Sequence, residues 1–270
     1  MRVRGKRYLL GCGLFLLVAA GALIVLEWGR RRQVEAAPPA LDGSGTAVPA
    51  KELEEQYRDP DTFARAIADV REHMHALQQR YLEARHTRTA RLTRYDGKGQ
   101  PSAVSETISH VQYHDGGERK TEIAHRQLLG KPSFFDPEKL KLEQSDAQVL
   151  SPFAKTKPEG LYRYRLEGVE ELNGRRLLRI HFEPVSPVER SFRGWAWIDP
   201  VTHEPVRMVG SPVKPRVRVD RFDMMLDYAL SENGHNQLRR LTIEAAGGFA
   251  LMSWHFRSET ELSDYREPEK

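Results

Sequence analysis

Histidine pairs are the residues of this sequence whose type and spacing could hold a metal ion. His110 and His114 lie four apart within a predicted strand, so they share one face of it. At roughly 3.3 Å per residue they stand about 13 Å apart, whereas zinc–ligand bonds are only about 2 Å long. His73 and His75 are two apart in a predicted helix and point to different sides. The sequence therefore predicts no metal site.

Acid–base and nucleophilic groups are the next candidates for chemistry. Asp220, Asp223 and Asp227 occupy one alternating stretch, which places them mostly on exposed or opposite faces. Neighbouring arginines such as Arg221 predict cross-strand charge pairs. Asp199 precedes a proline and is predicted to form a turn instead of acting as a base. No Gly-x-Ser-x-Gly motif or phosphate loop occurs. We predict no catalytic residue and no cofactor, and we expect a binding protein, not an enzyme.

The stretch 192–200 is the element around which the chain is organised. Small or aliphatic residues alternate there with bulky ones, among them Trp195 and Trp197, and this period of two is typical of a strand with two different faces. Gly194 weakens a strand and predicts the close approach of another element. Residues 205–209 read as the antiparallel return. The aromatic residues are either ordinary core or the lining of a ligand cavity.

More strands surround this hairpin. The turn-forming pairs that separate them are Asp96-Gly97, Asp115-Gly116, Asn173-Gly174 and Asn233-Gly234. The predicted strands are 86–95, 103–114, 118–128, 161–171, 175–184, 191–199, 205–210, 216–230, 236–246 and 250–263. Consecutive hairpins predict an antiparallel meander that curls into a barrel or half-barrel. The fold class is therefore α+β and mainly antiparallel β.

One helix is predicted from Asp59 to about residue 82. Asp59 is a suitable N-cap, and Pro60 suits the first helical position. Apolar residues follow at helical spacing and predict a stripe that packs on the sheet. These residues are Phe63, Ile67, Val70, Met74 and Leu77, followed by Tyr81. Between the strands, residues 131–160 predict either a lid over a cavity or a surface loop with a small helix.

The N-terminus carries an apolar run at 9–26, which is long enough to span a bilayer as a helix. Basic residues at 2–7 and 30–32 flank it, and they predict an uncleaved anchor with its N-terminus in the cytoplasm. The alternatives are a signal sequence cleaved near residue 36, with secretion to the periplasm, and lipidation at Cys12. We expect a single-pass protein of the bacterial inner membrane, with its folded part in the periplasm.

Three regions follow from these features. Residues 1–32 form the anchor or signal sequence, residues 33–58 a Pro- and Ala-containing linker, and residues 59–270 the folded domain.

Net charge argues against a nucleic-acid partner. The whole chain carries +4, and residues 1–32 carry seven Lys or Arg and one Glu, or +6, so the remainder is −2. Nucleic-acid-binding surfaces are basic, which this remainder is not. Cys12 is the single cysteine, so the folded part has no disulfide and depends on its apolar core.

Several turn and strand motifs carry a family resemblance over residues 60–265 in outline. They are Asn173-Gly174, the strand 178–182 with Glu183-Pro184, Gly-Trp-Ala-Trp-Ile-Asp-Pro at 194–200 and Pro-Val-Arg at 205–207. The pattern resembles the bacterial lipoprotein-localisation factors, comprising a periplasmic carrier and its outer-membrane receptor, and in particular the outer-membrane lipoprotein-sorting proteins. The resemblance implies a half-barrel of about ten or eleven strands, with helices on its concave face and a cavity for acyl chains. The carrier is soluble and the receptor lipidated, whereas this chain has a predicted membrane span.

The predicted function is non-catalytic binding of a lipid or an acylated protein, in lipid or lipoprotein transport or sorting. The expected partners are acyl chains, the membrane and a membrane or envelope protein. The alternative is a membrane-anchored regulatory or scaffolding module that binds a partner protein with its sheet. The cavity-lining candidates are Leu178, Ile180, Phe182, Ala196, Ile198, Phe222, Met224, Met252, Trp254 and Phe256, with the helix stripe Phe63, Ile67, Val70, Met74 and Leu77 facing them.

Overall fold

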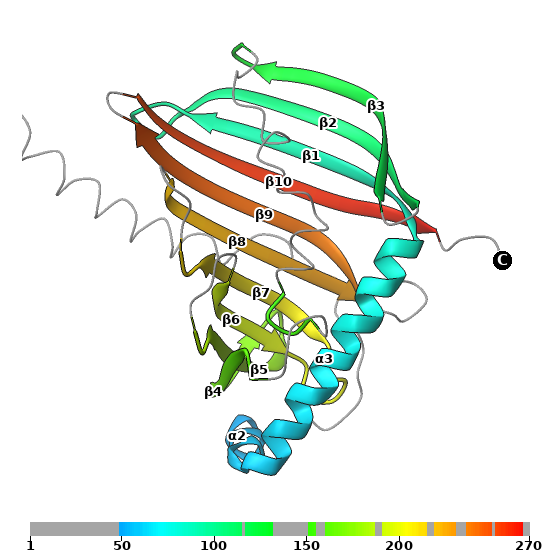
Figure 1. Ribbon diagram of the computed structural model, residues 1–270, viewed down its shortest axis with the longest axis vertical. Helices are drawn as coiled ribbons and strands as arrows, with labels where there is room; N and C mark the ends of the chain where they lie inside the picture. The colour runs from blue at the N-terminus through cyan, green and yellow to red at the C-terminus, as the bar shows by residue number, and fades with distance from the viewer. Residues whose placement is uncertain are drawn as a thin grey trace, which may run out of the picture. The chain divides into compact units, whose positions relative to one another are not determined.

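A computed structural model describes residues 49–114, 117–131, 151–154, 160–186, 191–214, 219–230, 236–249 and 252–266. Within these ranges the chain forms two helices and ten strands (Figure 1). Neither helix is both long enough and apolar enough to cross a membrane. The anchor predicted at 9–26 and most of the insertion at 131–160 lie outside the described residues.

The two helices follow one another near the start of the described chain. They are α2 (Ala50–Arg58) and α3 (Pro60–Glu83). The Asp59 carboxylate accepts a hydrogen bond of 2.8 Å from the backbone N–H of Thr62, and Pro60 occupies the first turn, which confirms the predicted cap. The predicted linker, 33–58, included α2. However, α2 buries Leu53 and Tyr57 in the core, so the packed part of the chain begins before residue 59.

Ten strands confirm the predicted ones, with ends shifted by three residues or fewer. They are β1 (Arg85–Tyr95), β2 (Pro101–His114), β3 (Gly117–Leu129), β4 (Tyr162–Leu172), β5 (Arg175–Pro184), β6 (Phe192–Ile198), β7 (Pro205–Pro212), β8 (Val219–Leu230), β9 (Asn236–Phe249) and β10 (Met252–Arg266). The turn pair Asn173-Gly174 has positive φ at both residues, 54° and 75°, as a tight hairpin requires.

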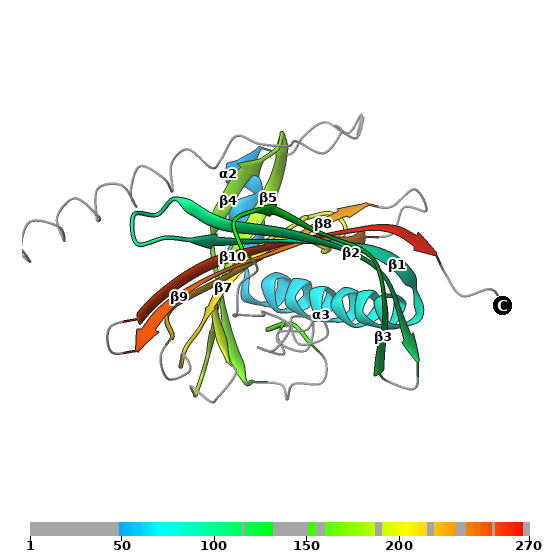
Figure 2. The same cartoon turned by 90° about the horizontal axis from the view of Figure 1, so that it is seen from above.

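All ten strands belong to one antiparallel sheet. The strand order is β3-β2-β1-β10-β9-β8-β7-β6-β5-β4, so the first three strands are joined to the last seven through the pairing of β1 with β10. The sheet curves, and α3 lies across its concave face (Figure 2). An open, curved antiparallel sheet with a helix in its concavity confirms the predicted half-barrel architecture.

A pair of glycines lies in the middle of the sheet. Gly194 on β6 is directly opposite Gly210 on β7. A Cβ atom at Gly194 would lie 2.0 Å from the carbonyl oxygen of Val209, so only glycine fits there. The element that approaches Gly194 is thus the neighbouring strand itself. On the other side, Phe182 is paired with Gly194, and its ring lies over Gly210.

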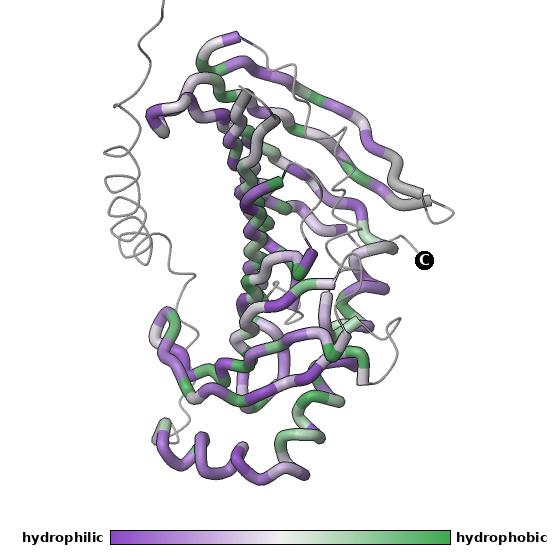
Figure 3. The backbone as a smooth tube through the Cα atoms, turned by 60° about the vertical axis from the view of Figure 1, so that its left-hand side comes forward, coloured by the Kyte–Doolittle hydropathy of each residue, from purple (hydrophilic) through white to green (hydrophobic). Residues whose placement is uncertain are grey.

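The two faces of the sheet differ in character because side chains alternate along each strand, as hydropathy does in Figure 3. The concave face is apolar from β5 to β9, with Ile180, Ala196, Met208, Leu226 and Leu241 aligned across five neighbouring strands and all buried. The convex face carries most of the charged side chains of the same strands.

Candidate ligand-binding site

The concave face brings the predicted cavity-lining residues into one cluster. Leu178, Ile180, Phe182, Ala196, Ile198, Met224 and Phe256 are buried there, and Phe222 and Trp254 are partly buried against them. The cross-strand pairs of Ile180 with Ala196 and of Leu178 with Ile198 place these side chains side by side. The structure describes the backbone of Met252 but not its side chain.

Helix α3 covers this cluster. Its stripe residues Ile67, Val70, Met74 and Leu77 are buried in the same core, and Phe63 packs against it from a partly exposed position. The structure therefore brings the predicted helix stripe and the predicted sheet faces together.

A short segment of the 131–160 insertion completes the cover. Residues 151–154 are all buried, and the Phe153 side chain is fully buried. The Phe153 ring stacks on Tyr164, with ring centroids 5.1 Å apart, and meets Phe182 edge-on at 6.2 Å. The Tyr164 hydroxyl donates a hydrogen bond of 2.8 Å to the carbonyl oxygen of Pro152. Burial raises the pKa of Tyr164, so this hydroxyl keeps its proton.

A small pocket lies between the 151–154 segment and the sheet. It is lined by Ser151, Pro152, Phe182, Phe192, Met208, Val209, Gly210, Met224 and Leu226. Its volume is about 10 Å³, which is about the room that one water molecule needs. This pocket by itself is too small to hold an acyl chain.

The part of the core beside β1, near the C-terminal end of α3, is more polar than the part between β5 and β9. His86 is 2% exposed, and its ring lies between those of Tyr81 and Tyr265, at centroid distances of 5.0 and 5.3 Å. Neither ring nitrogen has a hydrogen-bond partner among the described residues. Burial, with the nearby charge of Arg88, lowers the pKa of His86 to about 3. The imidazole is therefore neutral at every physiological pH.

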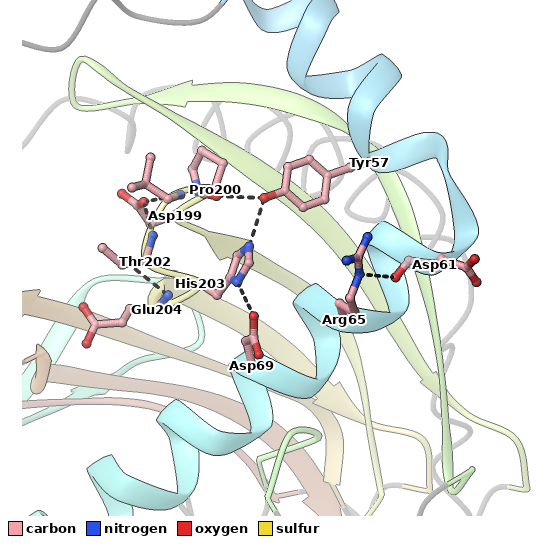
Figure 4. A network of polar contacts seen from close by, with 10 residues as sticks. Tyr57, Asp61, Arg65, Asp69, Asp199, Pro200, Thr202, His203 and Glu204 are labelled. Carbon is pink, nitrogen blue, oxygen red and sulfur yellow. Dashed lines mark hydrogen bonds and ion pairs between the residues drawn. The ribbon is translucent and has the colours of Figure 1, made fainter.

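At the other end of the core, both helices hold the β6–β7 turn, residues 199–204 (Figure 4). The Tyr57 hydroxyl donates to the carbonyl oxygen of Pro200 at 2.7 Å and lies 2.9 Å from Nε2 of His203. Nδ1 of His203 lies 2.8 Å from a carboxylate oxygen of Asp69 on α3. The Asp199 carboxylate accepts from the next two backbone N–H groups of the turn, which confirms its predicted role as a turn-former.

The convex face carries a pair of tryptophans surrounded by charged side chains. The indole N–H groups of Trp195 and Trp197 donate to Glu167 and Glu170, at 3.0 and 2.8 Å. The guanidinium of Arg179 lies over both indole rings, 5.5 and 5.8 Å from their centroids. Trp195 is 36% exposed. This outward surface is aromatic and carries charged side chains of both signs.

Charge pairs account for two of the three aspartates that could have suggested chemistry, and Asp220 is exposed. Asp227 pairs with Arg207 at 2.6 Å, and Asp223 accepts from Ser211 and from Arg221. Arg221 also meets Glu244 across the strand pair, as predicted, at 3.6 Å. Within the described ranges no three histidine, cysteine or acidic side chains gather as metal ligands. For His114 the structure describes the backbone but not the side chain.

Sequence patterns missed three parts of the site. Phe153 stands in an aperiodic segment, so nothing indicated that it fills the core. The contact of Tyr57 with His203 joins residues 146 apart in the sequence. His86 occupies a strand position where the alternation gave no sign of burial. Proline and glycine signals marked the turns around these residues, but no local signal marked the contacts themselves.

Comparison with protein-family models and with curated proteins finds no match. Solved structures do match. A domain assigned to the outer membrane lipoprotein-sorting proteins of Vibrio parahaemolyticus matches with 13% identity and a TM-score of 0.35, covering 74% of this chain and 93% of its own. A LolA-superfamily protein from Nitrosomonas europaea matches with 8% identity and a TM-score of 0.34, covering 77% and 94%. The Pseudomonas aeruginosa MucA/MucB complex matches with 12% identity and a TM-score of 0.23, covering 75% and 100%.

Two of the three are described as a lipoprotein-sorting domain and a LolA-superfamily protein, the kind of protein that the turn and strand motifs resemble. The TM-scores are low, so the function proposed below is argued from the contacts of this chain.

Proposed function

We propose that the folded part of this protein binds the acyl chain of a lipid or of an acylated protein between the concave face of the sheet and its covers. It carries out no chemistry on that ligand. The observation that carries this proposal is the construction of the core. An apolar sheet face is closed by separate elements, α2, α3 and the 151–154 segment, instead of by a second sheet.

The 151–154 segment is the element that an acyl chain would displace. Phe153 occupies an apolar site between Tyr164 and Phe182, and a side-chain hydrogen bond from Tyr164 to Pro152 ties the segment to the sheet. Moving a phenylalanine side chain out of a core costs roughly 3–5 kcal/mol. The part of an acyl chain that fills the vacated space can bury about as many carbons as leave, roughly seven methylenes at about 0.8 kcal/mol each, or about 6 kcal/mol in all. Replacing Phe153 by an acyl chain therefore gives a net gain of free energy, which offsets part of the entropy lost when the ligand is ordered on binding.

Location is the second part of the proposal. The apolar run at 9–26, flanked by basic residues, would anchor the chain in the bacterial inner membrane with its N-terminus in the cytoplasm. Residues 33–48 would then hold the folded part at the periplasmic face. There it would receive lipids or lipoproteins from the membrane, and an anchored binder of this kind would hand its ligand to another protein instead of diffusing away with it.

Photo-crosslinking tests this proposal on the full-length protein. Bacteria expressing it are fed a palmitic acid that carries a diazirine, membranes are irradiated, and labelled peptides are mapped by mass spectrometry. We expect labels on the concave face, at Phe182 and Met224, and none on the convex tryptophans Trp195 and Trp197. A map with no concave-face label would reject acyl-chain binding.

Two substitutions at one position give a matched control. Phe153→Ala removes the aromatic ring from its site and is expected to raise the concave-face labelling several-fold. Phe153→Leu keeps an apolar side chain there and is expected to label nearly as the wild type does. Equal labelling of both variants and the wild type would mean that the 151–154 segment does not occupy the ligand site.

A second candidate is a module that binds a partner protein with its sheet. The exposed aromatic surface of Trp195, supported by Arg179 and Trp197 on the convex face, favours it, because aromatic and arginine side chains dominate protein interfaces. In that case Trp195→Ala would abolish partner capture and leave the acyl-chain labelling unchanged.

A further inference from the structure

The contacts around His203 join three elements that are distant in the sequence. Tyr57 lies on α2, Asp69 on α3 and His203 in the β6–β7 turn (Figure 4). We propose that a protonated His203 acts as a latch that holds α2 and α3 on this turn. Loss of its proton releases α2 and opens the end of the apolar core that α2 covers. The regulatory consequence rests on the proposed acyl-chain binding, whereas the latch itself does not.

The three hydrogen bonds around Tyr57 and His203 need more protons than a neutral imidazole supplies, which places a positive charge on His203. The Tyr57 hydroxyl has one proton and uses it for the carbonyl oxygen of Pro200, which can only accept. The contact between Nε2 of His203 and the same hydroxyl oxygen then needs a proton on Nε2. Nδ1 faces the Asp69 carboxylate and needs a proton there too. Only the doubly protonated imidazolium makes all three hydrogen bonds at once.

The neighbouring charges fit this assignment. Burial raises the pKa of Tyr57, and the negative charges of Asp199 and Asp69 add to the effect, so the tyrosine stays protonated. The carboxylate of Asp199 is itself paired with Arg175 of β5, which leaves Asp69 as the direct counter-ion of His203.

Glu204 and Arg65 are two further charged residues drawn near the latch in Figure 4. Glu204 points away from His203 in Figure 4, and its backbone N–H donates to Thr202. On α3, Arg65 donates a hydrogen bond of 3.3 Å to the carbonyl oxygen of Asp61 in its own helix.

The backbone of His203 is held in an unusual conformation. Its φ is 54°, in the left-handed region that few residues other than glycine adopt, although histidine is found there more often than most. A histidine in this position is sustained by the contacts of its side chain. Releasing the imidazole therefore removes a restraint on the turn as well as on the helices.

Opening α2 would expose one end of the core. Leu53 and Tyr57 are the α2 residues that belong to the buried cluster, and they cover it beside β4. The hinge lies at Asp59 and Pro60, where α2 ends and α3 begins. Histidine is the side chain that ordinarily changes its charge between pH 5 and 8. The latch is therefore closed while His203 carries its proton and opens when that proton is lost.

Hydrogen–deuterium exchange on the full-length protein in lipid nanodiscs tests the latch without any ligand. After correction for the pH dependence of intrinsic exchange, the amides of α2 should exchange about tenfold faster at pH 8 than at pH 5.5, because one charge-assisted hydrogen bond is lost. His203→Gln cannot change its charge and should abolish the difference. Equal protection of α2 at the two pH values in the wild type would overturn the latch, whatever the variant does.

A second histidine supplies the matched control. His255 pairs with Glu244 on the convex face at 3.2 Å and touches neither helix. His255→Gln should keep the full pH difference in α2. Loss of the difference in this variant would also reject the latch, because the effect would then come from a distant titration.

Crosslinking of the diazirine-bearing palmitic acid at the two pH values tests the regulatory consequence. We expect several-fold more label on the concave face at pH 8 in the wild type, and a pH-independent high level in His203→Gln. Equal labelling at both pH values, with α2 opening as expected, would show that the latch does not control the site. If exchange behaves as expected and no acyl chain is bound at either pH, the proposed function fails and the latch stands.

Discussion

Replacing His86 with phenylalanine should make the protein more resistant to acid. The imidazole is buried between the rings of Tyr81 and Tyr265, and its pKa lies near 3 in the folded state against 6.5 for the free side chain. Between pH 6.5 and about pH 3, His86 binds a proton in the unfolded chain but not in the folded chain. Stability is therefore greatest above pH 6.5 and falls as pH is lowered.

The magnitude follows from the shift. Each pH unit below 6.5 costs about 1.4 kcal/mol of folding free energy, so the loss at pH 5 is about 2 kcal/mol. It levels off near pH 3, where the folded state also takes the proton. Phenylalanine keeps an aromatic ring in the same place and has no nitrogen to protonate or to leave without a partner. The variant should thus gain about 2 kcal/mol over the wild type between pH 8 and pH 5.

Urea unfolding at pH 8, 6.5 and 5 measures this difference, with the other histidines cancelling between the two proteins. His110→Phe is the matched control, because His110 is exposed on β2. It should leave the pH profile as in the wild type. Parallel stability curves for His86→Phe and the wild type from pH 8 to pH 5 would refute the argument that a neutral imidazole is buried here.

Three further outcomes are expected. Ile67→Ala, which empties a buried position of the α3 stripe, should cost about 2–5 kcal/mol in chemical denaturation. Gly194→Ala should be strongly destabilising, because its Cβ would meet the Val209 carbonyl at 2.0 Å, whereas Gly97→Ala, with open space around it, should be nearly neutral. A protein with the predicted anchor at 9–26 should stay in the membrane fraction through alkaline carbonate washing with its N-terminus intact, and a washed-out product beginning near residue 37 would contradict it.

Local signals were enough to predict the strands and the long helix. Turn pairs such as Asn173-Gly174 impose their own backbone conformation, and the period of two around Ala196 and Ile198 reflects burial on one face. The α3 stripe likewise follows from helical spacing. These features depend on neighbours within a few residues, so the sequence displays them directly.

The covers of the core depend on contacts that no local pattern encodes. Phe153 fills an apolar site formed by strands that follow it in the chain, and Tyr57 reaches a turn 143 residues away. The same holds for α2, whose mostly charged sequence reads as linker, although two of its residues enter the core. A segment with one or two buried side chains has no periodicity to detect, and its position is decided by the surface that it covers.

The proposed latch at His203 and the burial of His86 predict opposite effects of acid on the two ends of α3. His203 holds Asp69, in the N-terminal half of α3, when it is protonated, whereas His86 disturbs the packing beside Tyr81, at the C-terminal end, when it is protonated. Acid should therefore tighten one end of α3 and loosen the other, so that pH selects which end of the helix opens. The comparison of exchange rates along α3 at pH 5.5 and pH 8 should show this as a gradient that changes sign. A uniform change along the helix would mean that α3 opens as one unit and that only one of the two histidines governs it.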